Sequence, residues 1–111
     1  MTEKEQKYLL DMHLAINEIN NFLGENRDYT VFTANLMLKS AVERQLITVG
    51  EAMNRLLTIN PDIAITAARN IVQFRNKITH EYDGVDDAIT WAVVVRHLPK
   101  LKQEIDALLG K

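Results

Sequence analysis

The sequence predicts an all-α protein, an up-and-down bundle of four main helices that could be divided into five pieces. Apolar residues recur at spacings of three and four along almost the whole chain, the period of a helix that buries one face. No stretch alternates with period two for long enough to form a strand. Glycine and proline are scarce, four and two among 111 residues, so long regular elements with few turns are expected. We expect residues 1–111 to form a single domain.

The first predicted helix begins after Thr2 and ends at Gly24. Thr2 and Glu5 have the spacing of a capping box, in which each side chain accepts a hydrogen bond from the backbone of the other residue. Gly24 tolerates the left-handed conformation that often follows the end of a helix. The apolar stripe between these signals should face the core; it comprises Leu9, Met12, Ile16, Ile19 and Leu23.

The second predicted helix begins near Asp28 or Thr30 and reaches Leu57, which would make it about 40 Å long. Its stripe runs from Val31 to Leu56. Gly50 lies inside this helix, where it costs about 1 kcal/mol relative to alanine. We expect the reason to be the close approach of another helix, and room for a ligand is the alternative.

The third helical region is predicted to begin at Asn60 and Pro61, because asparagine is a good N-cap and proline is favoured at the first helical position. It could be broken near Thr66, and Gly84 is its expected end.

The last helix should follow a cap at Asp86 and bury one apolar face. Pro99 lies within it and should kink or interrupt it around Val95, because proline lacks an N–H and its ring disturbs the preceding turn. The expected apolar face consists of Trp91, Val95, Leu98, Leu101, Ile105 and Leu108.

Composition excludes several classes of function. Cysteine is absent, which removes thiol catalysis, cysteine-containing zinc sites and disulfide frameworks. The first ten residues lack the order of a signal peptide and no apolar run approaches about 20 residues, so a cytoplasmic protein is expected. The net charge is −2, whereas a protein that coats nucleic acid non-specifically is strongly basic. Any contact with phosphate must therefore come from a local basic patch.

The motif RNKITHEY, residues 75–82, places Arg75, His80 and Tyr82 in one short piece of predicted helix. Asn76 and His80 share a face because they are four residues apart. Arg75 and His80 are five apart, so an ideal helix separates them by about 140° around its axis and about 7.5 Å along it. They could serve one small ligand only if the helix distorts near its end or if a second subunit brings an identical motif opposite.

The chemistry available to this motif is limited. The chain has no glycine-rich phosphate loop and no zinc-ligand spacing, and HEYDGVDD lacks the alternating pattern of a calcium loop, so no metal or cofactor is expected. Arginine offers a planar donor fork that suits phosphate, and histidine transfers protons near neutral pH. This pair suffices for cleaving RNA, whose 2′-hydroxyl attacks its own phosphate, but not for DNA. The alternative is that Arg75 and His80 are solvated partners of the helix dipole and that Tyr82 is a packed ring.

The motif matches the Arg-x4-His-x-Tyr signature of HepT-like toxins, a branch of the HEPN superfamily of small α-helical ribonucleases. AVERQLITVGEAMNRLL, residues 41–57, resembles the second helix of that family, and WAVVVRHLPKLKQEIDALL, residues 91–109, resembles its last helix. The likeness therefore covers most of the chain in order and implies a HEPN-like helical domain.

The resemblance implies a metal-independent endoribonuclease that works as a homodimer, with two copies of the motif facing each other in a cleft. By position, Arg75 would bind phosphate, His80 would transfer protons, Asn76 could orient His80, and Tyr82 would be the third signature residue. The family also implies a toxin–antitoxin pair, in which a small nucleotidyltransferase antitoxin adds AMP to the motif tyrosine, here Tyr82. The rival hypothesis is a non-catalytic nucleotide-binding or adaptor bundle that dimerises.

Overall fold

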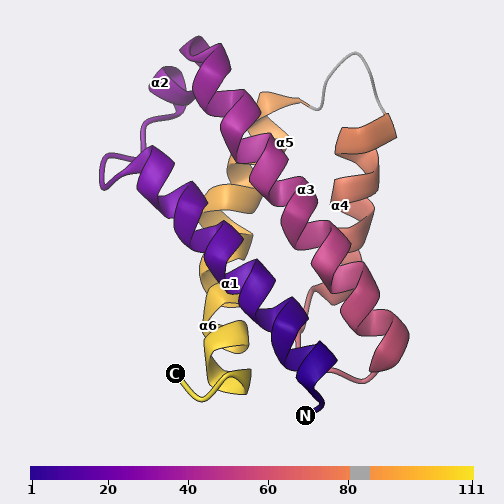
Figure 1. Cartoon of the computed structure of the whole chain (residues 1–111). Helices are drawn as coiled ribbons and strands as arrows, with labels where there is room; N and C mark the ends of the chain where they lie inside the picture. Colours follow the sequence, from indigo (N-terminus) through magenta and orange to yellow (C-terminus); the bar gives the residue numbers. More distant parts are fainter. Residues whose placement is uncertain (81–85) are drawn as a thin grey trace.

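The computed structural model describes residues 1–80 and 86–111, and within these ranges it contains only helices, turns and loops (Figure 1). Four rods run alternately up and down, so the predicted all-α bundle of four main helices is confirmed. No helix in the described ranges is both long and apolar enough to cross a membrane. The elements are α1 (Glu3–Leu23), α2 (Tyr29–Ala34), α3 (Leu36–Ile59), α4 (Ala68–His80), α5 (Asp87–Ala92), the π-helical segment η1 (Val93–His97) and α6 (Leu98–Leu108).

Helix α1 begins and ends where the sequence predicts. The Thr2 hydroxyl accepts a hydrogen bond from the Glu5 backbone N–H at 3.2 Å, and the Glu5 carboxylate accepts one from the Thr2 N–H at 3.4 Å. Gly24 follows the helix with φ at 67°, a conformation that side-chain-bearing residues rarely adopt. The capping box and the terminating glycine are therefore confirmed.

The second predicted helix is wrong in one respect, since it is divided at Asn35 into α2 and α3. The side chain of Asn35 accepts a hydrogen bond from the Leu38 N–H at 3.0 Å and caps α3. The break lets α2 turn so that Phe32 is buried against the ring of Trp91, with 5.0 Å between ring centroids. Val31, expected on the buried stripe, is consequently 55% exposed.

The start predicted for the third helix is also wrong. Asn60 ends α3 instead of capping a new helix, and residues 61–67 form turns before α4 begins at Ala68. The Asn60 side-chain oxygen accepts a hydrogen bond from the Asp62 N–H, and its amide nitrogen donates to Glu5 at 3.1 Å. The side chain of Asn60 is thus engaged in a local turn and in a contact to α1, and it does not cap a helix start. That contact is the largest cause of the lowered pKa of Glu5.

The last rod is interrupted near Val95, as the sequence predicts from Pro99. Asp86 caps α5 by accepting a hydrogen bond from the Ala88 N–H at 2.8 Å. The π-helical segment η1 then rotates the apolar face, so that Val93 and Val94 are buried while Val95 is 37% exposed. The interruption is confirmed, and the expectation that Val95 belongs to the buried face is wrong.

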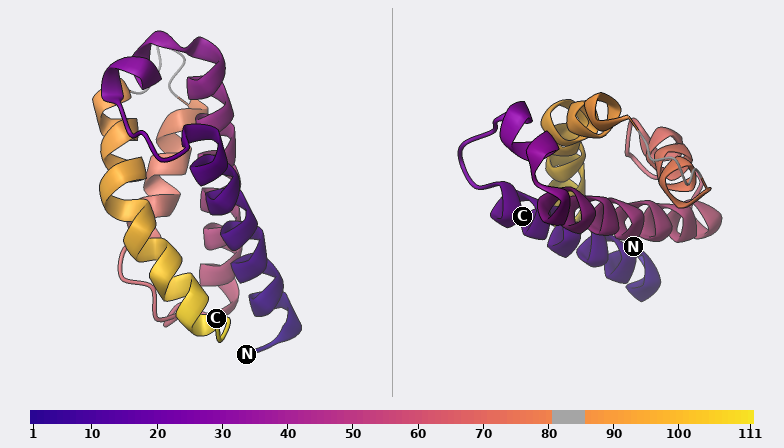
Figure 2. Two further views of the ribbon diagram at one scale, coloured as in Figure 1. Left: turned by 90° about the vertical axis from the view of Figure 1, so that its left-hand side faces the viewer. Right: turned by 90° about the horizontal axis from the view of Figure 1, so that it is seen from above.

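Helix α3 is the central element of the bundle, because it packs against both α1 and α4. The view from above shows α1 and α4 along different sides of α3, with the α5–η1–α6 rod closing the bundle (Figure 2). Leucine, isoleucine, valine and methionine side chains fill the space between these helices. The largest fully buried apolar side chains are Phe32, Leu9, Met12, Ile16, Ile19, Met53, Leu56, Leu98, Ile105, Val42 and Val49.

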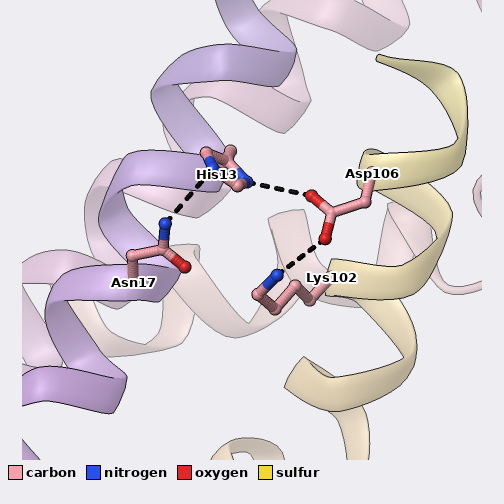
Figure 3. Close-up of polar contacts among 4 residues, drawn as sticks. All are labelled: His13, Asn17, Lys102 and Asp106. Carbon is pink, nitrogen blue, oxygen red and sulfur yellow. Dashed lines mark hydrogen bonds and ion pairs between the residues drawn. The ribbon is translucent and has the colours of Figure 1, made fainter. Parts of the chain in front are cut away.

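A polar network joins α1 to α6 (Figure 3). His13 Nδ1 lies 2.9 Å from Asp106 Oδ1, and the Lys102 ammonium donates to Asp106 Oδ2 at 2.6 Å. Asn17 Nδ2 lies 3.2 Å from His13 Nε2 on the other side of the ring. His13 therefore has a structural role, since it joins α1 to α6 beside the apolar stripe of α1.

Replacing Asp106 with asparagine should lower the free energy of unfolding near neutral pH by about 1 kcal/mol, because a charge-assisted hydrogen bond is lost. The Lys102 hydrogen bond, aided by His13, lowers the pKa of Asp106. The stabilisation is thus complete above the unfolded pKa of about 3.9 and is lost as pH falls through the lower folded pKa. Denaturant melts at a series of pH values should show the two proteins converging in acid. A gap that persists at the lowest pH would contradict this account.

Candidate functional site

The candidate site lies along α4, where the helix is regular from Ala68 to His80. Its core-facing side is anchored by Ile71, with Phe74 and Ile78 packed against the core. Because the helix continues through both residues, Arg75 and His80 keep the predicted rotation of about 140° about its axis. Within one chain they do not converge.

Arg75 lies at the seam between α3 and α4, with its side chain 25% exposed. Its Nη1 donates to Asn76 Oδ1 at 2.6 Å, and its Nη2 lies 3.7 Å from Glu51 Oε1 on α3. The Nε atom is buried and has no hydrogen-bond partner. The guanidinium is therefore held between two oxygen-bearing side chains, and its donor capacity is only partly used.

Gly50 makes this position of Arg75 possible. A Cβ atom at residue 50 would overlap the Cβ of Arg75 and would lie 2.6 Å from its Cγ and 3.3 Å from the carbonyl oxygen of Ile71. The predicted reason for an interior glycine, the close approach of another helix, is therefore confirmed. The side chain that approaches belongs to the motif arginine itself.

His80 is exposed and is the last residue of α4. Asn76 is also exposed and lies one turn earlier on the same face of the helix, as predicted. The Thr79 hydroxyl donates to the carbonyl oxygens of Arg75 and Asn76, both at 3.1 Å, and so stabilises the last turn. Tyr82 and the predicted helix end at Gly84 lie outside the described residues.

Two elements flank the motif on its C-terminal side. Lys39 on α3 pairs with Asp87 on α5 at 3.1 Å, which fixes the start of α5 against α3. Burial raises the pKa of the neighbouring Glu43 carboxyl, and the negative charge of Asp87 raises it further while Lys39 opposes the shift. The chain that follows the motif is thus attached to the same helix, α3, that holds Arg75.

Glu51 is the site residue that spacing alone missed. The sequence places it next to Gly50 within a segment that resembles the family's second helix, but its contact with Arg75 depends on how α3 packs on α4. In residues 1–80 and 86–111, no three carboxylate or imidazole side chains cluster as ligands of a metal ion would.

Comparison with known proteins identifies the family. The model of the family described as "Ribonuclease HepT-like" matches residues 12–108, which include the motif and all of α3. The chain belongs to the HepT-like ribonuclease family. The protein is accordingly an endoribonuclease of the HepT-like type, and the predicted resemblance to this family is confirmed.

The sequences of individual relatives align with most or nearly all of this chain. A Thermococcus cleftensis protein named "Probable ribonuclease HepT" is 30% identical over 112 residues, covering 97% of this chain and 98% of its own. A Methanocaldococcus jannaschii protein, provisionally named an RNase, is 31% identical over 111 residues, covering 96% and 98%. A second protein of that organism, also provisionally named an RNase, is 28% identical and covers 92% and 84%. No solved structure gives a significant match.

Proposed function

We propose that this HepT-like ribonuclease is the cytoplasmic toxin of a toxin–antitoxin pair and cleaves RNA without a metal ion at a composite site in a homodimer. The observation that carries the proposal is the part of the motif from Arg75 to His80 on α4, in a chain that belongs to this family. Arg75 and His80 are too far apart around the helix to act together within one chain. A twofold axis beside α4 would bring Arg75 of one protomer toward His80 of the other.

The chemistry assigned to each residue follows from its side chain. The His80 imidazole accepts the proton of the RNA 2′-hydroxyl, the 2′-oxygen bonds to the adjacent phosphorus, and the bond from phosphorus to the 5′-oxygen breaks. The leaving 5′-oxygen takes a proton from solvent water, and the imidazolium returns its own proton to solvent, so each site uses one imidazole. The products are a 2′,3′-cyclic phosphate and a 5′-hydroxyl. The Arg75 fork binds the phosphate oxygens, whose negative charge grows in the transition state, and Asn76 orients the guanidinium through the 2.6 Å hydrogen bond.

The direct test is cleavage of matched substrates in the presence of a chelator. The RNA oligonucleotide should be cut to products ending in a cyclic phosphate, whereas DNA of the same sequence should remain intact. An RNA with one 2′-deoxy nucleotide at the cleaved position should resist cutting there only. Products with a 3′-hydroxyl, or cutting of the deoxy substrate, would contradict the mechanism. Binding of RNA with no products at all would favour the adaptor hypothesis.

We also propose that the partner is a small nucleotidyltransferase antitoxin, which neutralises the toxin by adding AMP to Tyr82. The support is the position of this tyrosine in the signature, two residues after His80. A negatively charged adenylyl group there would repel RNA phosphates. Co-expression with the antitoxin should add the mass of one adenylyl group to the wild type and none to Tyr82→Phe. An unmodified wild-type mass would exclude this mode of control.

A further inference from the structure

A cavity lies next to the candidate site, in the groove between α3 and α4. Its volume is about 340 Å³. Polar side chains dominate the lining, and two aliphatic side chains complete it; the lining residues are Asn54, Thr58, Arg69, Gln73, Leu57 and Val72. No residue of this cavity belongs to the family signature.

The cavity lies about one helical turn from the position of Arg75. On α3, Asn54 follows Gly50 by one helical turn, and on α4, Val72 precedes Arg75 by three residues. Since Gly50 and Arg75 are in contact, the cavity is the next turn of the same groove, about 5 Å away.

One face of α4 connects the cavity to the catalytic end of the helix. Arg69, Gln73, Asn76 and His80 are separated by four, three and four residues, so they form a single stripe. All four are exposed, and together they extend about 16 Å along the axis. The stripe offers a cation, two amides and an imidazole in that order, groups that suit a polyanion carrying bases.

We propose that this cavity is a subsite for a nucleotide of single-stranded RNA next to the cleaved phosphate, an inference that rests on the proposed function. The Arg69 guanidinium binds the phosphate of that nucleotide, and within the described ranges no carboxylate pairs with Arg69 to compete. Asn54 and Gln73 each offer both a donor and an acceptor to a base edge. Leu57 and Val72 supply the apolar part of the lining against which the nucleotide packs.

Charge explains why a local cation should matter here. The chain carries a net charge of −2, so the overall field does not attract RNA. Arg69 is a positive group on the same face of α4 as the exposed His80. A phosphate-binding arginine about 16 Å along α4 from His80 would set affinity and register without taking part in the bond changes.

The test measures binding of a fluorescent RNA oligonucleotide to the His80→Ala protein, so that the RNA stays uncut. Adding Arg69→Ala should weaken binding about 5- to 10-fold and should reduce the slope of log K against log salt by about 0.7, the loss of one phosphate contact with a single strand. Arg69→Lys should retain most of the affinity. Arg27→Ala is the matched control and should change binding less than twofold. Residue 27 belongs to the connection between α1 and α2, a segment that lies on the opposite side of the bundle from α4 (Figure 1).

Equal affinities and equal slopes for Arg69→Ala and Arg27→Ala would overturn the subsite. A 5′-mononucleotide serves as the competitor that separates the two possible sources of phosphate. If binding of the mononucleotide depends on Arg69 while binding of RNA does not, the cavity binds free nucleotide and the proposal fails. Arg69-dependent RNA binding by a wild type that never cuts RNA would instead contradict the proposed cleavage mechanism and leave the contact between Arg69 and RNA standing.

Discussion

The His80→Ala protein is expected to cleave RNA about 10²- to 10⁴-fold more slowly than the wild type, because it lacks the group that moves the 2′-hydroxyl proton. Arg75→Ala should cost about 10²- to 10³-fold, because the charge that develops on the phosphate is no longer bound. Lysine at position 75 should recover only part of this loss, since an ammonium lacks the planar fork. The measurement is single-turnover cleavage in chelator, with thermal melts to show that each variant is folded.

His97→Ala is the control for the histidine. His97 is also exposed, but it lies in η1 on a different rod, and its removal should change the rate less than twofold. Full activity in both His80→Ala and Arg75→Ala would end the assignment of the site to α4.

The second large effect is expected at Gly50. Alanine there must push apart α3 and α4, because the added methyl overlaps the Cβ of Arg75. Overpacking of this kind costs about 2 kcal/mol, reduced by the gain in helix propensity of about 1 kcal/mol. The effect on catalysis should be larger, since a displacement of about 1 Å at the guanidinium can lower the rate about 10²-fold. Rate and unfolding free energy should therefore be measured on the same sample.

Gly24→Ala provides the matched comparison. Nothing lies within 4 Å of a Cβ at this position, but its φ of 67° strains any side-chain-bearing residue. It should lose about 1 kcal/mol of stability with an unchanged cleavage rate. If Gly50→Ala behaves like Gly24→Ala, the close packing of α3 on α4 does not position Arg75.

Local sequence signals predicted the fold well where no contact between distant parts of the chain overrides them. The capping box at Thr2 and the interruption caused by Pro99 are both present, because each depends on hydrogen bonds within a few residues of the chain. The break at Asn35 was missed, because it depends on burying Phe32 against Trp91 nearly 60 residues away in the sequence. Asn60 and Pro61 are residues that favour a helix start. In the structure, however, Asn60 ends α3, and its side chain donates to Glu5 on α1.

The candidate site shows the same limit. Helical spacing alone predicted that Arg75 and His80 diverge and that an interior glycine marks a close helix contact. The partner of that glycine and the contact from Arg75 to Glu51 follow from the register of α4 on α3, which no local pattern encodes. For the same reason the cavity beside Arg69 appears only once the two helices are packed.

The most direct test of the composite site uses mixed dimers. Arg75→Ala and His80→Ala chains carrying different tags are co-expressed, and the heterodimer is isolated by both tags in turn. If each site combines Arg75 of one protomer with His80 of the other, the heterodimer keeps one intact site of two. About half of the wild-type activity should therefore return. A heterodimer as inactive as either parent homodimer would show that both residues act within one chain and would contradict the account.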